Sequence, residues 1–197
     1  MNITHQSNKQ FNSYKEGLDL DFLRKYCTEH GEVRTFRRGE TLEDANEPAR
    51  WMAYVKKGCF KYMVHNKEEG KDYCTGFAFE DEFVGDYPNC LSGKMSEVTI
   101  VAGTSCKVFQ ITGQELCSLL DSANNKELKQ AISEHLFSQI YAQYLDIYRM
   151  TIRERYKRLL LRSPDIVQSI SLKDIASYLK VTPTTISNIR REITFGL

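Results

Sequence analysis

Short polar side chains that can hydrogen-bond to another molecule cluster near the C-terminal end of the chain, in the segment Ser171–Ile193. The segment reads SLKDIASYLKVTPTTISNIRREI. Ser171, with Asp174 three residues later, is a short form of the capping box that begins a helix. Thr182 is a helix-capping residue type, and Pro183 suits the first helical position, where its missing N–H has no intrahelical partner to lose. The segment therefore predicts two short helices joined by a turn.

The apolar residues of this segment fit two helices that cross steeply. Ala176 is small enough to lie at the crossing. Five larger apolar residues are spaced to face inwards, namely Ile175, Leu179, Val181, Ile186 and Ile189. The turn falls at Lys180, where glycine is frequent, and a left-handed backbone at a lysine costs roughly 1–2 kcal/mol. The pattern favours a helix-turn-helix over an ordinary helical hairpin, which would share the apolar spacing.

The polar side chains of the second helix are expected on its outer face. A helix fits the major groove of B-DNA, where short hydroxyl and amide groups reach base edges or phosphates. We expect Asn188 to bind adenine through a bidentate pair, and Arg190 and Arg191 to hold phosphates. The full candidate DNA-binding set is Ser171, Lys173, Thr182, Thr184, Thr185, Ser187, Asn188, Arg190 and Arg191.

Charge and hydropathy agree with a module that faces phosphates. The formal net charge of the chain is only +1, but residues 151–197 carry nine Lys and Arg against four acids. A basic end on a faintly acidic body suits nucleic-acid binding. The chain has no run of about 18 apolar residues and its N-terminus lacks the apolar core of a secretory signal. We therefore expect a cytoplasmic protein with no membrane partner.

Upstream of this module the periodicity is that of β-strands. From Val33 to about Ile111, short β segments alternate with glycines, which supply the positive φ that turns require. The expected strands are Val33–Phe36, Trp51–Lys56, Cys59–Val64, Tyr73–Phe79, Val98–Val101 and Cys106–Ile111. Many short strands at this spacing predict a small antiparallel barrel or jelly roll. A short amphipathic helix from about Gly17 to Gly31 is expected before it.

A long helix is predicted between the two parts. From about Lys126 to Arg153 there is no Gly or Pro, and apolar side chains recur every three or four residues. About 28 helical residues span about 40 Å, and their apolar stripe must be buried against something. The barrel and a second copy of the helix are both candidates, and we favour the second copy. A further helix, Arg153–Arg162, is expected to end before Pro164.

These elements predict an α+β fold in three parts. Residues 1–123 are assigned to an N-terminal tail and an antiparallel, jelly-roll-like β-roll that acts as a sensor domain. Residues 124–152 are assigned to a dimerisation helix, and residues 153–197 to a helix-turn-helix DNA-binding domain.

With these elements in this order, the chain resembles the Crp-Fnr family of transcription regulators. Four stretches carry the likeness: FRRGE at Phe36–Glu40, VKKGCFK at Val55–Lys61, FVGD at Phe83–Asp86, and the helix-turn-helix. Their order and spacing fit from about Leu18 to Ile193. The resemblance implies a β-roll of the cyclic-nucleotide-binding type, a homodimer joined by the long helix, and binding of double-stranded DNA, with RNA polymerase as a further partner.

The resemblance also shows where this sequence departs from nucleotide-binding members. In those members an acid after a glycine binds the ribose, and an Arg-Ser or Arg-Ala pair binds the cyclic phosphate. Asp86 matches the acid, but Ser96 and Glu97 stand at the Arg-Ser positions. A carboxylate repels a phosphate, and no guanidinium replaces the lost one. We therefore expect no cyclic AMP binding of the usual kind, and we expect the pocket to hold either another, unidentified small-molecule effector or no ligand. The candidate effector-pocket residues are Gly85, Asp86, Ser96, Glu97 and Tyr141.

The recognition helix departs from the family pattern too. Members often have an Arg-Glu-x-x-x-Arg set that reads guanine and its neighbours, whereas Pro183, Thr184 and Asn188 occupy those positions here. The resemblance therefore implies that a different DNA sequence is read.

Two rival functions follow from the same residues. The first is a small-molecule-binding β-roll that signals without sequence-specific DNA binding, with Ser171–Ile193 as a packing hairpin. The second is a metalloenzyme of the cupin type, which needs clustered ligands. The four histidines are far apart in sequence, and the six cysteines contain no CxxC pair. We therefore expect neither a metal site nor an iron–sulfur cluster, and no enzymatic activity. The sequence identifies no cofactor. The thiols are expected to be reduced and mostly buried.

Overall fold

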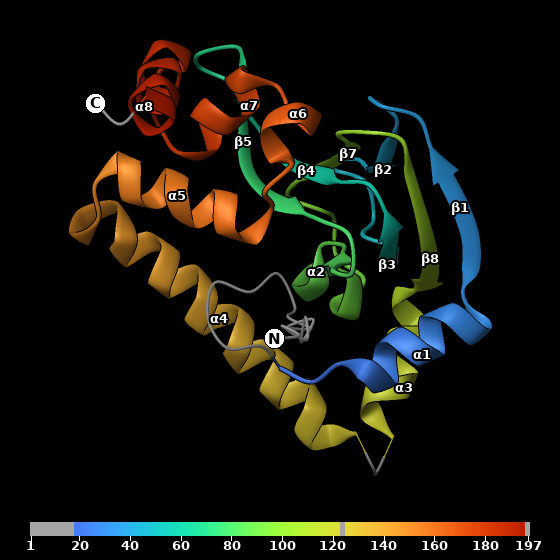
Figure 1. Cartoon of the computed structure of the whole chain (residues 1–197). Coiled ribbons are helices and arrows are strands. Elements are labelled where there is room, and N and C mark those ends of the chain that lie inside the picture. The colour runs from blue at the N-terminus through green and yellow to red at the C-terminus, as the bar shows by residue number, and fades with distance from the viewer. Residues whose placement is uncertain (1–17, 123–124, 196–197) are drawn as a thin grey trace, which may run out of the picture.

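The computed structural model describes residues 18–122 and 125–195. Within these residues, two four-stranded sheets form an antiparallel β-roll, which is followed by a long helix and a C-terminal body of short helices (Figure 1). One sheet has the order β1-β8-β3-β6 and the other β2-β7-β4-β5. The strands are β1 Glu32–Phe36, β2 Thr41–Glu43, β3 Trp51–Lys57, β4 Phe60–Asn66, β5 Lys71–Ala78, β6 Phe83–Val84, β7 Thr99–Ala102 and β8 Cys106–Thr112.

The core of the roll lies between the two sheets. Val55, Phe60, Ile100 and Val108 are fully buried there, because alternate side chains of a strand point to the same face. The ring of Phe36 meets that of Phe60 edge to face, with 5.5 Å between centroids. All six expected strands are present within two residues of their predicted ends. The short strands β2 and β6 were not predicted, because two or three residues carry no readable alternation.

Three helices cover the sheet that contains β3 and β8. They are α1 (Asp21–His30), α3 (Gly113–Asp121) and the first half of α4 (Lys126–Arg149). Their buried residues, such as Leu23, Leu116 and Ile132, pack on Met52 and Ile111. A fourth helix, α2 (Tyr87–Ser92), follows β6.

The long helix is shorter than the sequence predicts. It ends at Arg149, and Met150 has an extended backbone, with φ −121° and ψ 141°. A capping box explains the break: the Glu154 N–H donates to Thr151 Oγ1 at 3.3 Å, and the Thr151 N–H donates to Glu154 Oε2 at 2.8 Å. A new helix, α5 (Ile152–Arg162), therefore begins and turns back over α4 (Figure 1).

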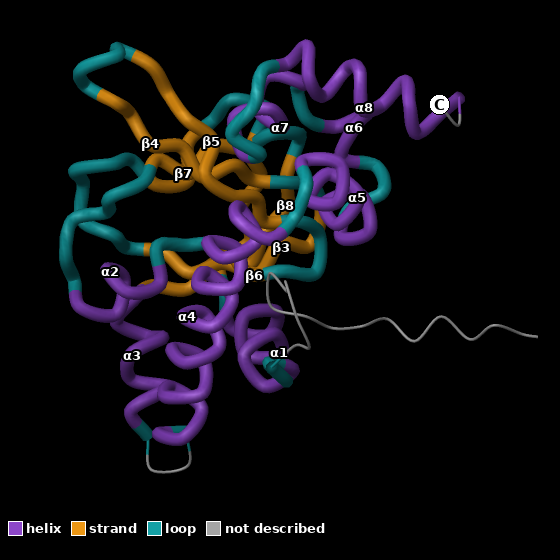
Figure 2. The backbone as a smooth tube through the Cα atoms, turned by 90° about the vertical axis from the view of Figure 1, so that its left-hand side faces the viewer, coloured by secondary structure: helices purple, strands orange, loops and turns teal. Residues whose placement is uncertain are grey.

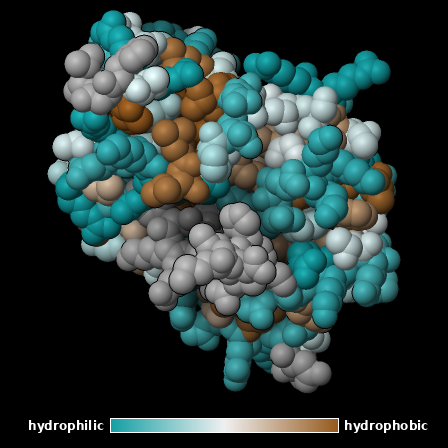
Figure 3. Space-filling view, viewed as in Figure 1, coloured by the Kyte–Doolittle hydropathy of each residue, from teal (hydrophilic) through white to brown (hydrophobic). Residues whose placement is uncertain are grey.

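The C-terminal body comprises α5, α6 (Ile166–Ser169), α7 (Leu172–Tyr178) and α8 (Pro183–Phe195). Its apolar core is shared with the β-roll, since the buried side chains of Cys74 and Phe77 belong to the same cluster. A Cβ atom at Gly103 would lie 2.6 Å from Ile170 Cδ1, so a larger residue there would require the Ile170 side chain to shift. Figure 3 shows apolar surface gathered over these helices, bordered by hydrophilic side chains.

Polar contacts fix the C-terminal body on the sheet that contains β4 and β5. Lys61 Nζ lies 3.0 Å from Asp174 Oδ2, and both side chains are less than 20% exposed. The Cys74 N–H donates to Ser177 Oγ at 2.9 Å. The helix-turn-helix is therefore docked on the β-roll rather than separated from it, which the sequence did not predict.

Candidate nucleic-acid interface and effector site

The helix-turn-helix forms as the sequence predicts. The Asp174 N–H donates to Ser171 Oγ at 3.1 Å and opens α7. Lys180 has a left-handed backbone with φ 57°, which lets the Val181 N–H donate to the Ala176 carbonyl at 2.9 Å. Thr182 then caps α8, because its Oγ1 accepts from the Thr185 N–H at 3.2 Å.

One face of α8 is free of packing contacts. Ile186 and Ile189 are buried against α7, whereas four polar residues at helical spacing are exposed: Thr184, Ser187, Asn188 and Arg191. Arg191 Nη2 donates to Asn188 Oδ1 at 3.2 Å, so the amide is held on the outer face. Figure 2 shows α8 at the periphery of the molecule. The exposed face is a continuous strip of hydroxyl, amide and guanidinium groups.

The other candidate DNA-binding residues surround this strip. Lys173 and Thr182 are exposed, while Thr185 and Arg190 are half-buried. The hydroxyl of Ser171 is directed inwards and donates to Asp174 Oδ2 at 2.7 Å. Ser171 therefore acts as a helix cap in this structure.

In the β-roll, the Asp86 carboxylate takes the hydrogen bonds of the groups around it. Asp86 is 9% exposed and its Oδ2 accepts from Ser96 Oγ at 3.0 Å, from Asn89 Nδ2 at 2.9 Å and from the Glu97 N–H at 3.2 Å. These donors would otherwise be available to an incoming anion. The groups that would bind a phosphate are thus used by an internal acid.

A second buried acid increases the negative charge of this region. Glu43 accepts from the backbone N–H groups of Arg50 and Trp51 at 3.0 and 3.3 Å. Burial raises the pKa of the Glu43 carboxyl, and the nearby charge of Asp86 adds to the rise. A phosphate placed here would meet two acids, and the charge of Arg50 offsets that of Glu43 only in part, because the pKa of Glu43 is still raised.

Comparisons with known proteins agree with this architecture. Residues 33–123 match the family model of the cyclic nucleotide-binding domain. FixK2 from Bradyrhizobium japonicum has a similar structure, with a TM-score of 0.69 at 19% identity over 84% of this chain and 86% of that one. A transcriptional regulator of the Crp/Fnr family from Eubacterium rectale gives 0.66 at 18% identity, over 91% and 85%. The c-di-GMP responsive regulator CLP from Xanthomonas campestris gives 0.62 at 14%, over 90% and 93%. No curated protein sequence matches the chain.

The chain has the Crp/Fnr fold. Its residues 33–123 form a domain of the cyclic nucleotide-binding type, and the predicted α+β fold class is confirmed. Of these structural neighbours, the Eubacterium rectale protein is described as a transcriptional regulator and CLP as a global regulator linked to gene expression.

Within this Crp/Fnr fold, two effector-pocket candidates lie away from Asp86. Tyr141 is 53% exposed on α4, and its ring stacks on Phe137 with 6.0 Å between centroids. The side chain of Glu97 is exposed, and only its N–H reaches Asp86. The expected repulsion of a phosphate by the Glu97 carboxylate is therefore not supported by the position of that side chain. Gly85, with φ 155°, accommodates the close approach of the Trp51 carbonyl, 2.5 Å from where a Cβ would lie.

Two other kinds of feature concern the described residues as a whole, namely membrane-spanning helices and metal sites. In residues 18–122 and 125–195, no helix is both long and apolar enough to cross a membrane. The same residues include no group of three or more His, Cys, Asp or Glu side chains placed to hold a metal ion.

Proposed function

We propose that this protein is a sequence-specific DNA-binding transcription regulator, and that the exposed face of α8 reads the DNA. The observation that carries the proposal is the division of α8 into a buried side, with Ile186 and Ile189, and an exposed polar side. The major groove of B-DNA is wide enough to admit an α-helix, so the exposed side of α8 can face base edges there. Asn188 has the donor and acceptor that adenine recognition needs, and Arg191 supplies a cation for phosphate.

The exposed face of α4 supports a homodimer. Five large side chains on this helix are more than half exposed: Phe137, Ile140, Tyr141, Tyr144 and Tyr148. Phe137, Tyr141, Tyr144 and Tyr148 follow one another at spacings of four, three and four residues, and Ile140 lies three residues after Phe137, so the five share one broad face. Such an apolar face on a soluble protein marks an interface, and a second copy of α4 offers a matching one. Two copies present two recognition helices, which need about 34 Å between them to meet successive major grooves.

The effector of this regulator is a small molecule other than cyclic AMP. The internal acid Asp86 and the absence of a guanidinium beside Ser96 support this part of the proposal. Ligand binding would change the DNA-binding end through the joint between α4 and α5, because the helix break at Met150 and Thr151 is where their relative angle is set.

The remaining assignments follow from this role. We propose a sensor domain over residues 1–123, a dimerisation helix over 124–152 and a DNA-binding domain over 153–197. A transcription regulator acts in the cytoplasm on double-stranded DNA and contacts RNA polymerase, and it needs no enzymatic activity.

Selection of bound duplexes from a random pool tests this function against a β-roll that signals without DNA. The expected result is enrichment of a pseudo-palindrome whose half-sites are one or more helical turns apart. Recovery of duplexes with no shared sequence would favour the signalling β-roll.

A further inference from the structure

A cavity of about 730 Å³ lies where three parts of the molecule meet, away from the Asp86 cluster. The β-roll contributes Tyr54 and Phe79, α4 contributes Gln143 and Ile147, and the C-terminal body contributes several residues of α5 and α7. This volume is in the range of small-molecule sites in proteins. An occupant would contact the sensor, the long helix and the DNA-binding end at once.

About half of the residues that line the cavity are apolar or aromatic, and the rest are polar or charged. Aromatic rings and aliphatic side chains line it on three sides, namely Leu18, Leu20, Tyr54, Phe79, Phe83, Ile140, Tyr144, Ile147, Leu159, Leu161, Tyr178 and Leu179. Such a lining favours the body of an apolar or aromatic molecule over a sugar or a free ion, because the main gain on binding is removal of apolar surface from water.

The charged groups of the cavity differ in their pairing. Arg162 donates to Glu82, Arg158 pairs with Asp146, and Arg24 pairs with Asp21. Arg155 has no such partner: its Nε atom is buried without a hydrogen bond, and none of the acids in residues 18–122 and 125–195 pairs with it. Buried donors are satisfied in most native structures, so this one indicates an acceptor from outside the chain.

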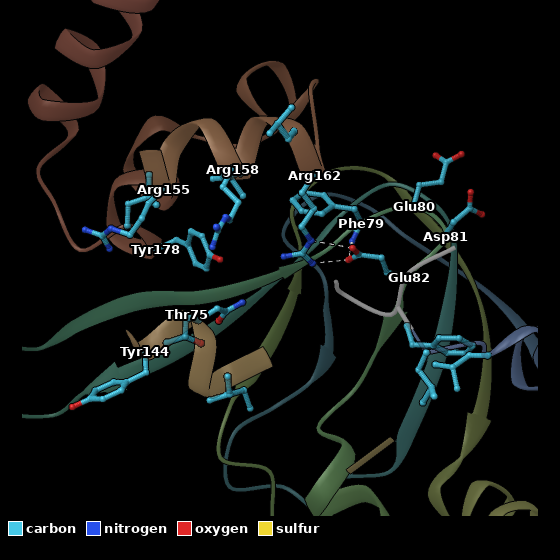
Figure 4. A pocket seen from close by; sticks show the side chains of 18 of the residues that line it. Thr75, Phe79, Glu80, Asp81, Glu82, Tyr144, Arg155, Arg158, Arg162 and Tyr178 are labelled. Atoms are coloured by element: carbon cyan, nitrogen blue, oxygen red, sulfur yellow. Dashed lines mark hydrogen bonds and ion pairs between the residues drawn. The ribbon is translucent and has the colours of Figure 1, made fainter. Parts of the chain in front are cut away.

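Arg155 lies at one end of the row of arginines that lines the cavity. Figure 4 shows Arg155, Arg158 and Arg162 following one another along α5, with Arg162 beside Glu82 and Arg155 at the other end of the row. Glu80 and Asp81 lie beyond Glu82, with their carboxylates directed away from the arginines. Lys180, in the turn before α8, also lines the cavity, and no salt bridge joins it to an acid of the described residues.

We propose that this cavity is a binding site for a small organic anion with an apolar body. The carboxylate or phosphate of the anion pairs with Arg155, and its apolar body lies between Tyr54, Phe79 and Ile147. The regulatory meaning of the site rests on the proposed function, because an occupant would stabilise the arrangement of sensor and DNA-binding end that it fits. Binding itself requires no DNA.

Two dyes with the same aromatic body test the site. The anionic probe is 8-anilinonaphthalene-1-sulfonate, and the uncharged probe is N-phenyl-1-naphthylamine; the fluorescence of each is titrated with the full chain. The expected result is saturable binding of the anion that weakens by about ten- to hundredfold in Arg155→Gln, the range of a charge-assisted hydrogen bond. The uncharged probe should change by less than about twofold. Arg153→Gln, on the same helix but outside the cavity, is the matched control and should leave both affinities unchanged.

A second variant keeps the proposal falsifiable if Arg155→Gln unfolds. Gln143→Trp fills the cavity from α4 and should abolish binding of both dyes, whereas Gln130→Trp, on the exposed part of the same helix, should not. Failure of the wild-type chain to bind the anionic dye, or equal binding by the wild type and both cavity variants, overturns the proposal. If the selection recovers no common DNA sequence but the anionic dye binds as expected, the proposed function is contradicted and the cavity is not. If a DNA sequence is enriched but the dye does not bind, the proposal for the cavity is contradicted and the proposed function is not.

Discussion

Arg162, in the last turn of α5, donates two hydrogen bonds to Glu82 of the β-roll, at 3.0 and 2.7 Å. The same guanidinium also donates to the Phe77 carbonyl at 2.8 Å and lies 4.9 Å from the centroid of the Phe79 ring. The side chains of Arg162 and Glu82 are almost buried, with 12% and 9% of their surface exposed. This bidentate pair joins α5 to the β-roll through charged groups that have little contact with water.

Removing one partner of this pair should destabilise the fold. Arg162→Met leaves Glu82 as a buried charge without its cation, and loss of one partner of a buried pair costs about 3–5 kcal/mol. Urea unfolding measures the change. Replacing both residues by Met should cost less than Arg162→Met alone, because no charge is then left unpaired. Lys71→Met, at the exposed Lys71–Glu69 pair, is the control and should produce no measurable change. Equal stability of Arg162→Met and the wild type would contradict this role.

The exposed face of α4 should hold the dimer together. Phe137→Glu combined with Tyr141→Glu places two charges in the seam, so we expect a monomer by sedimentation at concentrations where the wild type is a dimer. Gln130→Glu adds one charge elsewhere on the same helix and should leave the dimer intact. A double variant that sediments as the wild type does would place the dimer interface elsewhere.

Cyclic AMP should not bind at Asp86. The carboxylate takes the hydrogen bonds of Ser96, Asn89 and the Glu97 N–H, and Ser96 and Glu97 stand where nucleotide-binding members have the Arg-Ser pair that holds the cyclic phosphate. Isothermal titration of the full chain with cyclic AMP is expected to show no saturable heat. A micromolar dissociation constant would show that the groups around Asp86 rearrange to release its carboxylate.

The six cysteines should differ in reactivity. Five are buried, and burial raises the pKa of the Cys27, Cys74 and Cys90 thiols to about 12. Cys117 is half-buried and donates to Asp121 Oδ2 at 3.2 Å, which raises its pKa because the acceptor stabilises the protonated thiol. A chromogenic disulfide reagent should therefore modify one thiol of the folded chain near neutral pH and all six after unfolding.

The hydrogen bond to Asp121 sets the pH dependence of that reaction. Asp121→Asn removes the acid, so the Cys117 pKa should fall and its reaction at pH 7 should become faster. Cys117→Ser should abolish the fast phase. A fast phase that persists in Cys117→Ser would mean that one of the five buried thiols becomes accessible instead.

The sequence predicts local features well and long-range contacts poorly. The two helices of the helix-turn-helix were predictable because Ser171, Thr182 and Pro183 mark helix starts by their own chemistry. The end of α4 was missed although Thr151 and Glu154 form a capping box, because the apolar spacing continues across the break. The pair of Arg162 and Glu82 was not predictable, since 80 residues separate them and neither belongs to a motif. The cavity beside Arg155 was missed for the same reason, because its lining comes from seven separate helices and strands and from the loops between them.

The most direct test of the claim that the exposed face of α8 reads DNA is the affinity of Asn188→Ala for two duplexes, the selected one and a scrambled one. Fluorescence anisotropy measures both affinities across a range of salt concentrations. Asn188→Ala should weaken binding to the selected duplex, by about 1–3 kcal/mol, and leave the scrambled duplex unchanged. Arg191→Ala, the matched comparison, should weaken both and lower the salt slope by about one. Identical behaviour of the two variants on both duplexes would contradict the account.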